Sequence, residues 1–138
     1  MVLITKEMMN EFINTQFPQS KITVEHVDGD SATIRHKITQ AELRPGGTVA
    51  GPVMFLVADC ALYVGILGRI GIVPLAVTTN MNINFLRKPS ADRDIIGVCK
   101  LIKVGKSLAI GEVSVYSEGL PDPVAHAVGT YAIPPKKD

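Results

Sequence analysis

The feature that most constrains the fold is an apolar run at residues 53–73, VMFLVADCALYVGILGRIGIV. A helix of this length could span a bilayer. The run contains Asp59 and Arg69, and each charge would cost roughly 2.5 to 3.5 kcal/mol near the centre of a membrane. Glycines at positions 65, 68 and 71 weaken it further as an isolated span. The run therefore predicts a buried helix in a soluble protein, without membrane association.

The size and charge of the chain favour one globular domain that covers residues 1–138. Its residues are 46% hydrophobic and 20% charged, which is typical of a folded protein with a sizeable core. A formal net charge of +1 argues against a nucleic-acid partner, because such proteins carry a dense basic patch. The first residues, MVLITKEMMNEF, have neither a basic start nor a long apolar core. We therefore expect no signal peptide and a cytoplasmic location.

The cysteines and the short motifs argue against several kinds of site. Cys60 and Cys99 lie in apolar runs without metal-ligand spacing, so we expect buried reduced thiols, with a disulfide as the alternative. HExxH, phosphate-loop and Rossmann patterns are absent from the sequence. We expect neither a metal ion nor a bound cofactor.

Local patterns predict three short elements before the apolar helix. Residues 5–17 place apolar side chains at helical spacing, with Thr5 as N-cap and Pro18 as the stop. Residues 22–38 predict two strands joined by an Asp-Gly turn at residues 28–30. Residues 42–52, ELRPGGTVAGP, predict a glycine- and proline-rich loop that leads into the helix.

After the apolar helix the pattern changes to that of strands. Four strands are expected at residues 75–86, 94–103, 107–117 and 123–133, separated by turn residues that suit antiparallel connections. Alternation is clearest at residues 80–85, where Met81, Ile83 and Phe85 share one face. One apolar helix followed by an unbroken meander predicts an α+β fold, with a curved antiparallel sheet wrapped around the helix.

Asp59 is the candidate catalytic residue with the clearest physical argument. Apolar residues flank it on both sides, and an ionised carboxylate in such a helix needs a partner, a wet cleft or a chemical role. The alternatives are a narrow solvent-facing stripe, or an ion pair with Arg69 or another cation.

The start of the apolar helix provides a second candidate. Pro52 suits the first helical position, where its missing N–H costs nothing, and this places Gly51 near the N-cap. A glycine lets an oxygen atom approach closely, and its N–H would lie beside the positive end of the helix dipole. This is suitable chemistry for an oxyanion site, with an ordinary capped turn as the alternative.

Together these two features carry a resemblance to a known family. The segment RPGGTVAGPVMFLVADCALYVGIL resembles the active-site segment of hotdog-fold acyl-CoA thioesterases of the phenylacetic-acid-degradation (PaaI-type) family. In that family a glycine opens the central helix and an acidic residue follows two turns later, and Gly51 and Asp59 match these positions. The segments AVTTNMNINFLRKP, VGKSLAIGEVSVYSE and AHAVGTY resemble the strands that follow. The resemblance covers residues 22–134.

The resemblance implies a homo-oligomer, a dimer or tetramer, with acyl-CoA sites at its subunit interfaces. The Gly51 N–H would polarise the thioester carbonyl, and Asp59 would act as general base on water or as nucleophile. Thr78, on the next strand, would hold that water or the carboxylate. The expected substrate contacts are Ala50, Pro52, Asn80, Arg87, Lys88, Lys106 and Ser107. Of these, Arg87, Lys88, Lys106 and Ser107 are expected near the CoA phosphates, with solvated turn residues as the alternative.

Helix geometry agrees with a site shared between subunits. The helical rise from Gly51 to Asp59 is about 12 Å. A general base must lie within roughly 3 Å of its proton, or one water away, so the two residues of one helix cannot serve the same carbonyl. A carboxylate from a partner's helix would fill the gap.

The sequence departs from the family pattern just before the helix. The family often has a histidine directly before the glycine and an asparagine further upstream, and these positions are Ala50 and Arg44 here. The second glycine of the motif is Pro52. The missing histidine bears on carbonyl polarisation, whereas Gly51 and Asp59 are retained.

Two other functions stay open beside thioester hydrolysis. A hotdog hydratase usually needs a histidine paired with the acid, and we expect His26, His36 and His126 to be core or surface residues. A non-catalytic acyl-CoA binding or sensing protein is favoured by the missing histidine. Cys60 projects about 100° away from Asp59 on a helix, so we expect a packed thiol rather than a nucleophile.

Overall fold

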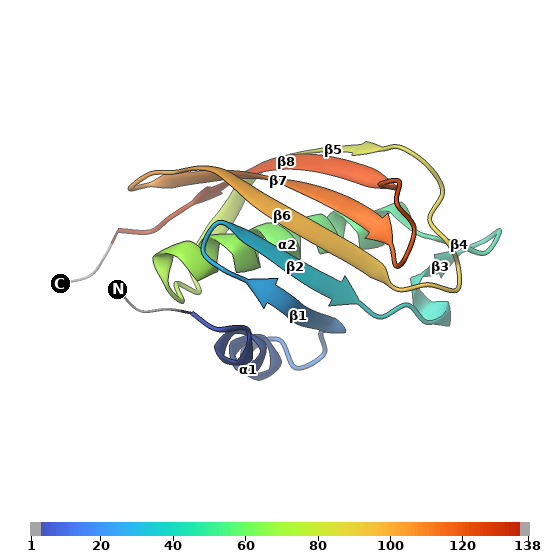
Figure 1. Ribbon diagram of the computed structural model, residues 1–138, viewed down its shortest axis with the longest axis horizontal. Coiled ribbons are helices and arrows are strands. Elements are labelled where there is room, and N and C mark those ends of the chain that lie inside the picture. The colour runs from blue at the N-terminus through green and yellow to red at the C-terminus, as the bar shows by residue number, and fades with distance from the viewer. Residues whose placement is uncertain (1–3, 136–138) are drawn as a thin grey trace.

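The architecture is one long helix enclosed by a curved antiparallel sheet. The computed structural model describes residues 4–135. The central helix is α2 (Gly51–Ile70), and the six-stranded sheet has the order β1-β2-β6-β7-β8-β5. Figure 1 shows the sheet curving over α2, with α1 (Lys6–Gln16) beside β1 and the β3–β4 hairpin near the start of α2. The predicted α+β hotdog architecture is confirmed.

Neighbouring strands are antiparallel, and two connections cross the sheet: the one that carries α2, and the one that follows the next strand. The predicted meander of four strands after α2 is therefore broken after its first strand, and the last three strands form it. The first hairpin pairs β1 (Ile22–Val27) with β2 (Ser31–His36), and β2 also pairs with β6 (Ile95–Val104). The meander then continues through β7 (Leu108–Ser117) and β8 (Ala125–Ala132). The last partner of β8 is β5 (Val77–Phe85), which forms one edge of the sheet.

The apolar run at residues 53–73, which is long enough to span a membrane, forms the core of this fold. By length and composition α2 could cross a membrane, with a mean hydropathy of 1.9. Its inward side chains are instead packed beneath the sheet, and Val57, Leu62 and Ile66 are completely buried. Small residues let the two layers approach closely: a Cβ added at Gly65 would lie 2.8 Å from the Cys99 Sγ atom, and one at Gly97 would lie 2.8 Å from Val57.

Most of the predicted local elements are confirmed. Thr5 caps α1 by accepting a hydrogen bond from the Met8 N–H at 3.1 Å. Asp28 closes the first hairpin by accepting hydrogen bonds from the N–H groups of Asp30 and Ser31. The four strands after α2 lie within two residues of their predicted bounds. Cys60 and Cys99 are free thiols, as predicted.

The segment before α2 is more ordered than a loop, and the helix starts one residue earlier than predicted. A short 3₁₀ helix η1 (Gln40–Glu42) is followed by a hairpin of β3 (Leu43–Arg44) and β4 (Thr48–Val49). Ala50 is the N-cap and Gly51 the first helical residue, so Pro52 occupies the second position rather than the first. A proline is tolerated there because the first N–H groups of a helix have no intrahelical acceptor.

Candidate active site

Asp59 lies half-buried in the middle of α2 and is held by two hydroxyl groups. The Thr78 Oγ1 hydroxyl donates to Asp59 Oδ1 at 2.7 Å, and the Tyr131 phenol donates to the same oxygen at 2.7 Å. No cation forms a salt bridge with Asp59 among residues 4–135. The alternative in which Asp59 pairs with Arg69 is wrong, because Arg69 binds Asp30 at 3.2 Å.

An irregularity in β5 brings Thr78 to the helix side of the sheet. Met81 and Ile83 are half-buried on the inner face, and in a regular strand Thr78 would point to the opposite side. The register with β8 shifts between Thr78 and Asn80, so that Thr78 is paired with the inward-facing Tyr131. Such a bulge adds one residue to a strand and redirects a side chain. Here it places a hydroxyl against Asp59.

A cavity of about 890 Å³ opens beside Asp59. Its walls come from α1 and the residues after it, from the middle of α2, and from the start of β5 with Tyr131. Apolar and aromatic side chains form much of this surface. They include Ile13, Phe17, Ile22, Leu56, Tyr63, Pro74, Ala76 and Val77. A cavity of this size with a few polar groups suits a small organic ligand.

Lys21 and Glu42, which also line this cavity, hold the segment that leads into α2. Glu42 accepts a hydrogen bond from Lys21 Nζ at 2.7 Å and from the Thr39 N–H at 2.6 Å. Burial favours the neutral acid, but these hydrogen bonds outweigh it and lower the pKa of Glu42 to about 2. The backbone carbonyl of Glu42 accepts from the Ala50 N–H at 2.9 Å. This half-buried ion pair therefore also positions the residue that caps α2.

Gly51 lines a different cavity, at the N-terminal end of α2. This second cavity has a volume of about 560 Å³ and also contains Arg44, Arg87, Lys88 and Phe85. The Gly51 N–H donates to no acceptor among residues 4–135. The three cationic residues give this cavity the charge that an anionic ligand requires. One chain thus has a carboxylate in one cavity and a free helix N–H with positive charge in another.

Comparisons with known proteins agree with this geometry. Residues 46–123 match the family model described as the thioesterase superfamily. A thioesterase candidate from a Silicibacter species is 38% identical, with 98% of this chain and 95% of that chain covered and a TM-score of 0.89. This chain belongs to the thioesterase superfamily. Comparison with curated protein sequences finds no match.

Two more distant structures share the thioesterase fold. Zebrafish thioesterase superfamily member 2 is 19% identical, with 94% of this chain and 99% of that chain covered and a TM-score of 0.84. The PaaI protein of the phenylacetic acid degradation operon of E. coli is 18% identical, with 96% of each chain covered and a TM-score of 0.81. At such identities the likeness shows the fold alone, whereas family membership supports thioester hydrolysis in general.

The thioesterase fold of a single chain brings only some of the predicted site residues together. Asp59 and Thr78 meet in the larger cavity, and Gly51, Arg87 and Lys88 meet in the smaller one. Ala50 and Pro52 flank Gly51 at the helix start, as their sequence positions require.

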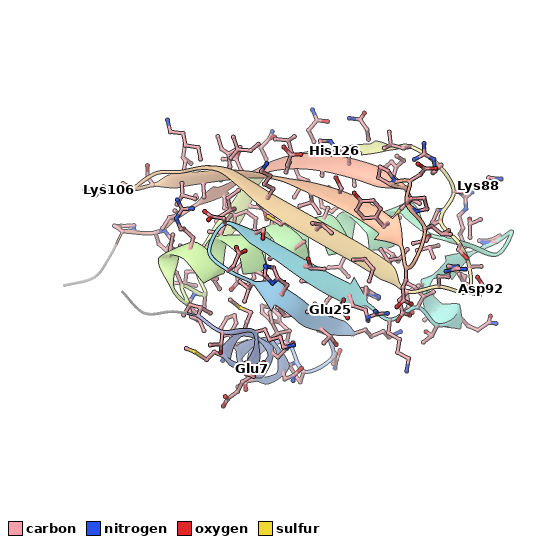
Figure 2. The ribbon with its side chains drawn as sticks, in the orientation of Figure 1. Glu7, Glu25, Lys88, Asp92, Lys106 and His126 are labelled. Atoms are coloured by element: carbon pink, nitrogen blue, oxygen red, sulfur yellow. The ribbon has the colours of Figure 1, made fainter. Side chains whose placement is uncertain are left out.

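The remaining predicted substrate contacts lie elsewhere in the chain. Asn80 is paired with Thr130 on the outer face of the sheet, away from α2. Lys106 and Ser107 form the turn between β6 and β7, and Figure 2 shows Lys106 and Lys88 at opposite ends of the molecule. Their roles in substrate binding stay predictions.

Sequence reasoning missed Tyr131 and the residues that α1 contributes to the cavity. A single tyrosine near the end of a predicted strand carries no local signal of function. His36 also lines the Asp59 cavity, but its Nδ1 atom lies 2.9 Å from the Lys37 carbonyl and no hydrogen bond joins it to Asp59. Within residues 4–135, no three His, Cys, Asp or Glu side chains are grouped as a metal site would require.

Cys60 is the neighbour of Asp59 in sequence but is unsuited to be a nucleophile. Burial and the nearby Asp59 carboxylate raise the pKa of the Cys60 thiol to about 12. A thiol with this pKa is almost entirely protonated at neutral pH, and the thiolate is the reactive form. The expectation of a packed, unreactive thiol agrees with this environment.

Proposed function

We propose that the protein hydrolyses an acyl-CoA thioester to the free acid and CoA. The observation that carries the proposal is the environment of Asp59. Its carboxylate has no counter-ion among residues 4–135 and lies at the wall of a largely apolar cavity. Carboxylates in such surroundings are common as general bases or nucleophiles. The cavity has room for an acyl group, and membership of the thioesterase superfamily supports the reaction type.

The proposed reaction uses Asp59 and the Gly51 N–H for different steps. Asp59 takes a proton from a water molecule, whose oxygen bonds to the thioester carbonyl carbon, or its carboxylate attacks that carbon directly. The carbonyl oxygen gains negative charge and accepts a hydrogen bond from the Gly51 N–H, which lies at the positive end of the α2 dipole. The C–S bond then breaks, and the departing CoA thiolate takes up the proton that water has lost. In the direct-attack route the acyl group is left on Asp59 as an anhydride, which a water molecule hydrolyses to the free acid and the regenerated carboxylate.

The two groups must come from different subunits if they act on one carbonyl. Gly51 and Asp59 line separate cavities in one chain, and about 12 Å of helical rise separates them. The outer side of the edge strand β5 pairs with no other strand of residues 4–135, and Val77 and Phe85 on it are each 54% exposed. Exposed strand edges with apolar side chains pair readily with another chain. We propose that a second copy pairs there and supplies the carboxylate.

The cationic cavity supports CoA as the carrier of the acyl group. Arg44, Arg87 and Lys88 surround the space in front of Gly51, and phosphate groups are bound by such clusters. With the thioester carbonyl at the Gly51 N–H, the nucleotide end of CoA would extend along these side chains. The acyl end would enter the apolar cavity beside the partner's Asp59.

A panel of acyl-CoA thioesters tests the proposed function, with release of free thiol as the readout. We expect steady turnover over many cycles, and a higher KM with little change in kcat when acyl-pantetheine replaces acyl-CoA. Tight binding of acyl-CoA without turnover would contradict hydrolysis and favour the binding or sensing function, to which the alanine at position 50 points. Equal KM values for both substrates would contradict the assignment of the cationic cavity to CoA.

Complementation between two inactive variants tests the shared site. We expect Gly51→Val and Asp59→Asn each to be nearly inactive alone. In a mixed dimer, one of the two sites combines an intact Gly51 with an intact Asp59, so an equimolar random mixture should recover about one quarter of the normal activity. Sedimentation should show at least a dimer. A fully active monomer near 14.8 kDa, or a mixture without recovery, would contradict the shared site.

A further inference from the structure

The two oxygens of the Asp59 carboxylate have different surroundings. Oδ1 accepts hydrogen bonds from both Thr78 and Tyr131, each at 2.7 Å. Oδ2 accepts no hydrogen bond from residues 4–135, and no buried side-chain polar atom in that range lacks a partner. Since Oδ2 has no partner in that range and is not among buried unpaired atoms, it is at least partly exposed to solvent. The carboxylate is thus held by one oxygen and free at the other.

The surroundings of Tyr131 keep its hydroxyl in place against the Asp59 carboxylate. Its side chain is only 4% exposed, and its ring centroid lies 5.9 Å from that of Tyr63. The phenol also approaches the backbone carbonyl of Asp59, at 3.2 Å. Burial and the adjacent carboxylate raise the pKa of the Tyr131 phenol, which keeps the hydroxyl protonated. It therefore remains a hydrogen-bond donor at neutral pH.

We propose that Tyr131 is a positioning residue that, together with Thr78, holds Asp59 by Oδ1 and leaves Oδ2 as the reacting oxygen. This inference rests on the proposed function. The terminal torsion of an aspartate has a broad distribution, so an unheld carboxylate would sample many orientations. Two donors on one oxygen restrict that torsion before substrate arrives. Such preorganisation contributes to catalysis because a small misplacement of a reacting atom lowers the rate strongly.

The sheet keeps the two donors together. Thr78 and Tyr131 are directly opposite each other on β5 and β8, at the point where the bulge begins. Their side chains therefore reach Asp59 from adjacent strands. Thr78 lies on the exposed edge strand, whereas Tyr131 is buried on the strand next to it. The buried phenol has fewer rotamers available, which makes it the more rigid of the two donors.

Replacing Tyr131 by Phe removes the hydroxyl and keeps the ring. We expect kcat to fall by about tenfold or more, the effect of losing one hydrogen bond to a charged group. KM should change by less than about twofold, because the hydroxyl does not bind substrate in this proposal. In an Asp59→Asn background the same replacement should have almost no further effect, since Tyr131 acts through the carboxylate.

The matched control is Tyr116→Phe, which removes a phenolic hydroxyl from the outer face of β7. It should leave kcat and KM unchanged. Should Tyr131→Phe fail to melt cooperatively, Thr78→Val removes the other donor from an exposed position, and the same loss of kcat and the same cycle with Asp59→Asn are expected. Thr78→Ser, which keeps a hydroxyl, should restore activity.

Three outcomes would overturn the inference. A normal kcat for folded Tyr131→Phe, or for Thr78→Val, would show that the donors do not position the carboxylate. If Tyr131→Phe lowered kcat as much in the Asp59→Asn background as in the unmodified protein, Tyr131 would act on something other than Asp59. If Asp59→Asn itself retained normal turnover, the proposed function would fail, and this inference with it. A loss for Asp59→Asn without a loss for Tyr131→Phe would reject the inference alone.

Discussion

Replacing Asp59 by Asn is expected to lower thioester turnover by roughly 10²-fold or more, the range for loss of a general base. The amide keeps the size of the side chain, and its oxygen can still accept from Thr78 and Tyr131, so the fold should survive. An amide is also cheaper than a carboxylate to hold among apolar groups. The thermal midpoint should therefore stay close to that of the unmodified protein.

Turnover and melting must be measured on the same preparation of Asp59→Asn. The suitable control is Asp30→Asn, which changes an exposed carboxylate that pairs with Arg69 and lines neither cavity. That variant should keep normal turnover. Near-normal activity of a well-folded Asp59→Asn protein would contradict the proposed mechanism. It would favour the alternative in which Asp59 is a solvent-facing carboxylate without a chemical role.

Replacing Gly51 by Val should reduce turnover by a comparable amount. Loss of one oxyanion donor typically costs about 2.7 to 4 kcal/mol in the transition state. A Cβ atom added at Gly51 would meet only ring carbons of Phe85, at 3.6 Å, which is an ordinary packing distance. The branched valine side chain is larger and would hinder the approach of a carbonyl oxygen to the N–H.

Gly51→Ala separates packing from access in this experiment. The alanine adds only the Cβ atom, which the structure accommodates, so its loss of turnover should be smaller than that of valine. Both variants should melt near the normal temperature, since the helix start has no conformation that demands glycine. If Gly51→Val turned over substrate at the normal rate, the oxyanion role of this N–H would be wrong.

Much of the fold follows from local patterns in the sequence. The apolar run at residues 53–73 cannot be a surface element, and the period-two segments after it can only bury one face by forming a sheet against it. The turn residues between these segments then favour antiparallel connections. The bounds of α2 were less well predicted, because the ion pair of Glu42 with Lys21 and the β3–β4 hairpin decide where the chain enters the helix.

Asp59 and Gly51 could be recognised because each conflicts with its local surroundings or marks a boundary. A carboxylate inside an apolar helix needs an explanation, and a glycine beside a proline marks a helix start. Tyr131 offers no such conflict. It follows small residues at the inward positions of β8, namely Ala125, Ala127 and Gly129. Its hydroxyl can reach Asp59 only when α2 packs against this strand.

Hydrophobic period and turn chemistry act over a few residues, so the positions of the helix and the strands can be read from local sequence. The hydroxyls that reach Asp59 depend on how distant strands pair. The alternation of Met81, Ile83 and Phe85 would place Thr78 on the outer face, and the bulge between Thr78 and Asn80 reverses this. That bulge arises from the pairing of β5 with β8, which are separated by two other strands along the chain. Local patterns do not encode a shift of one residue in a long-range register.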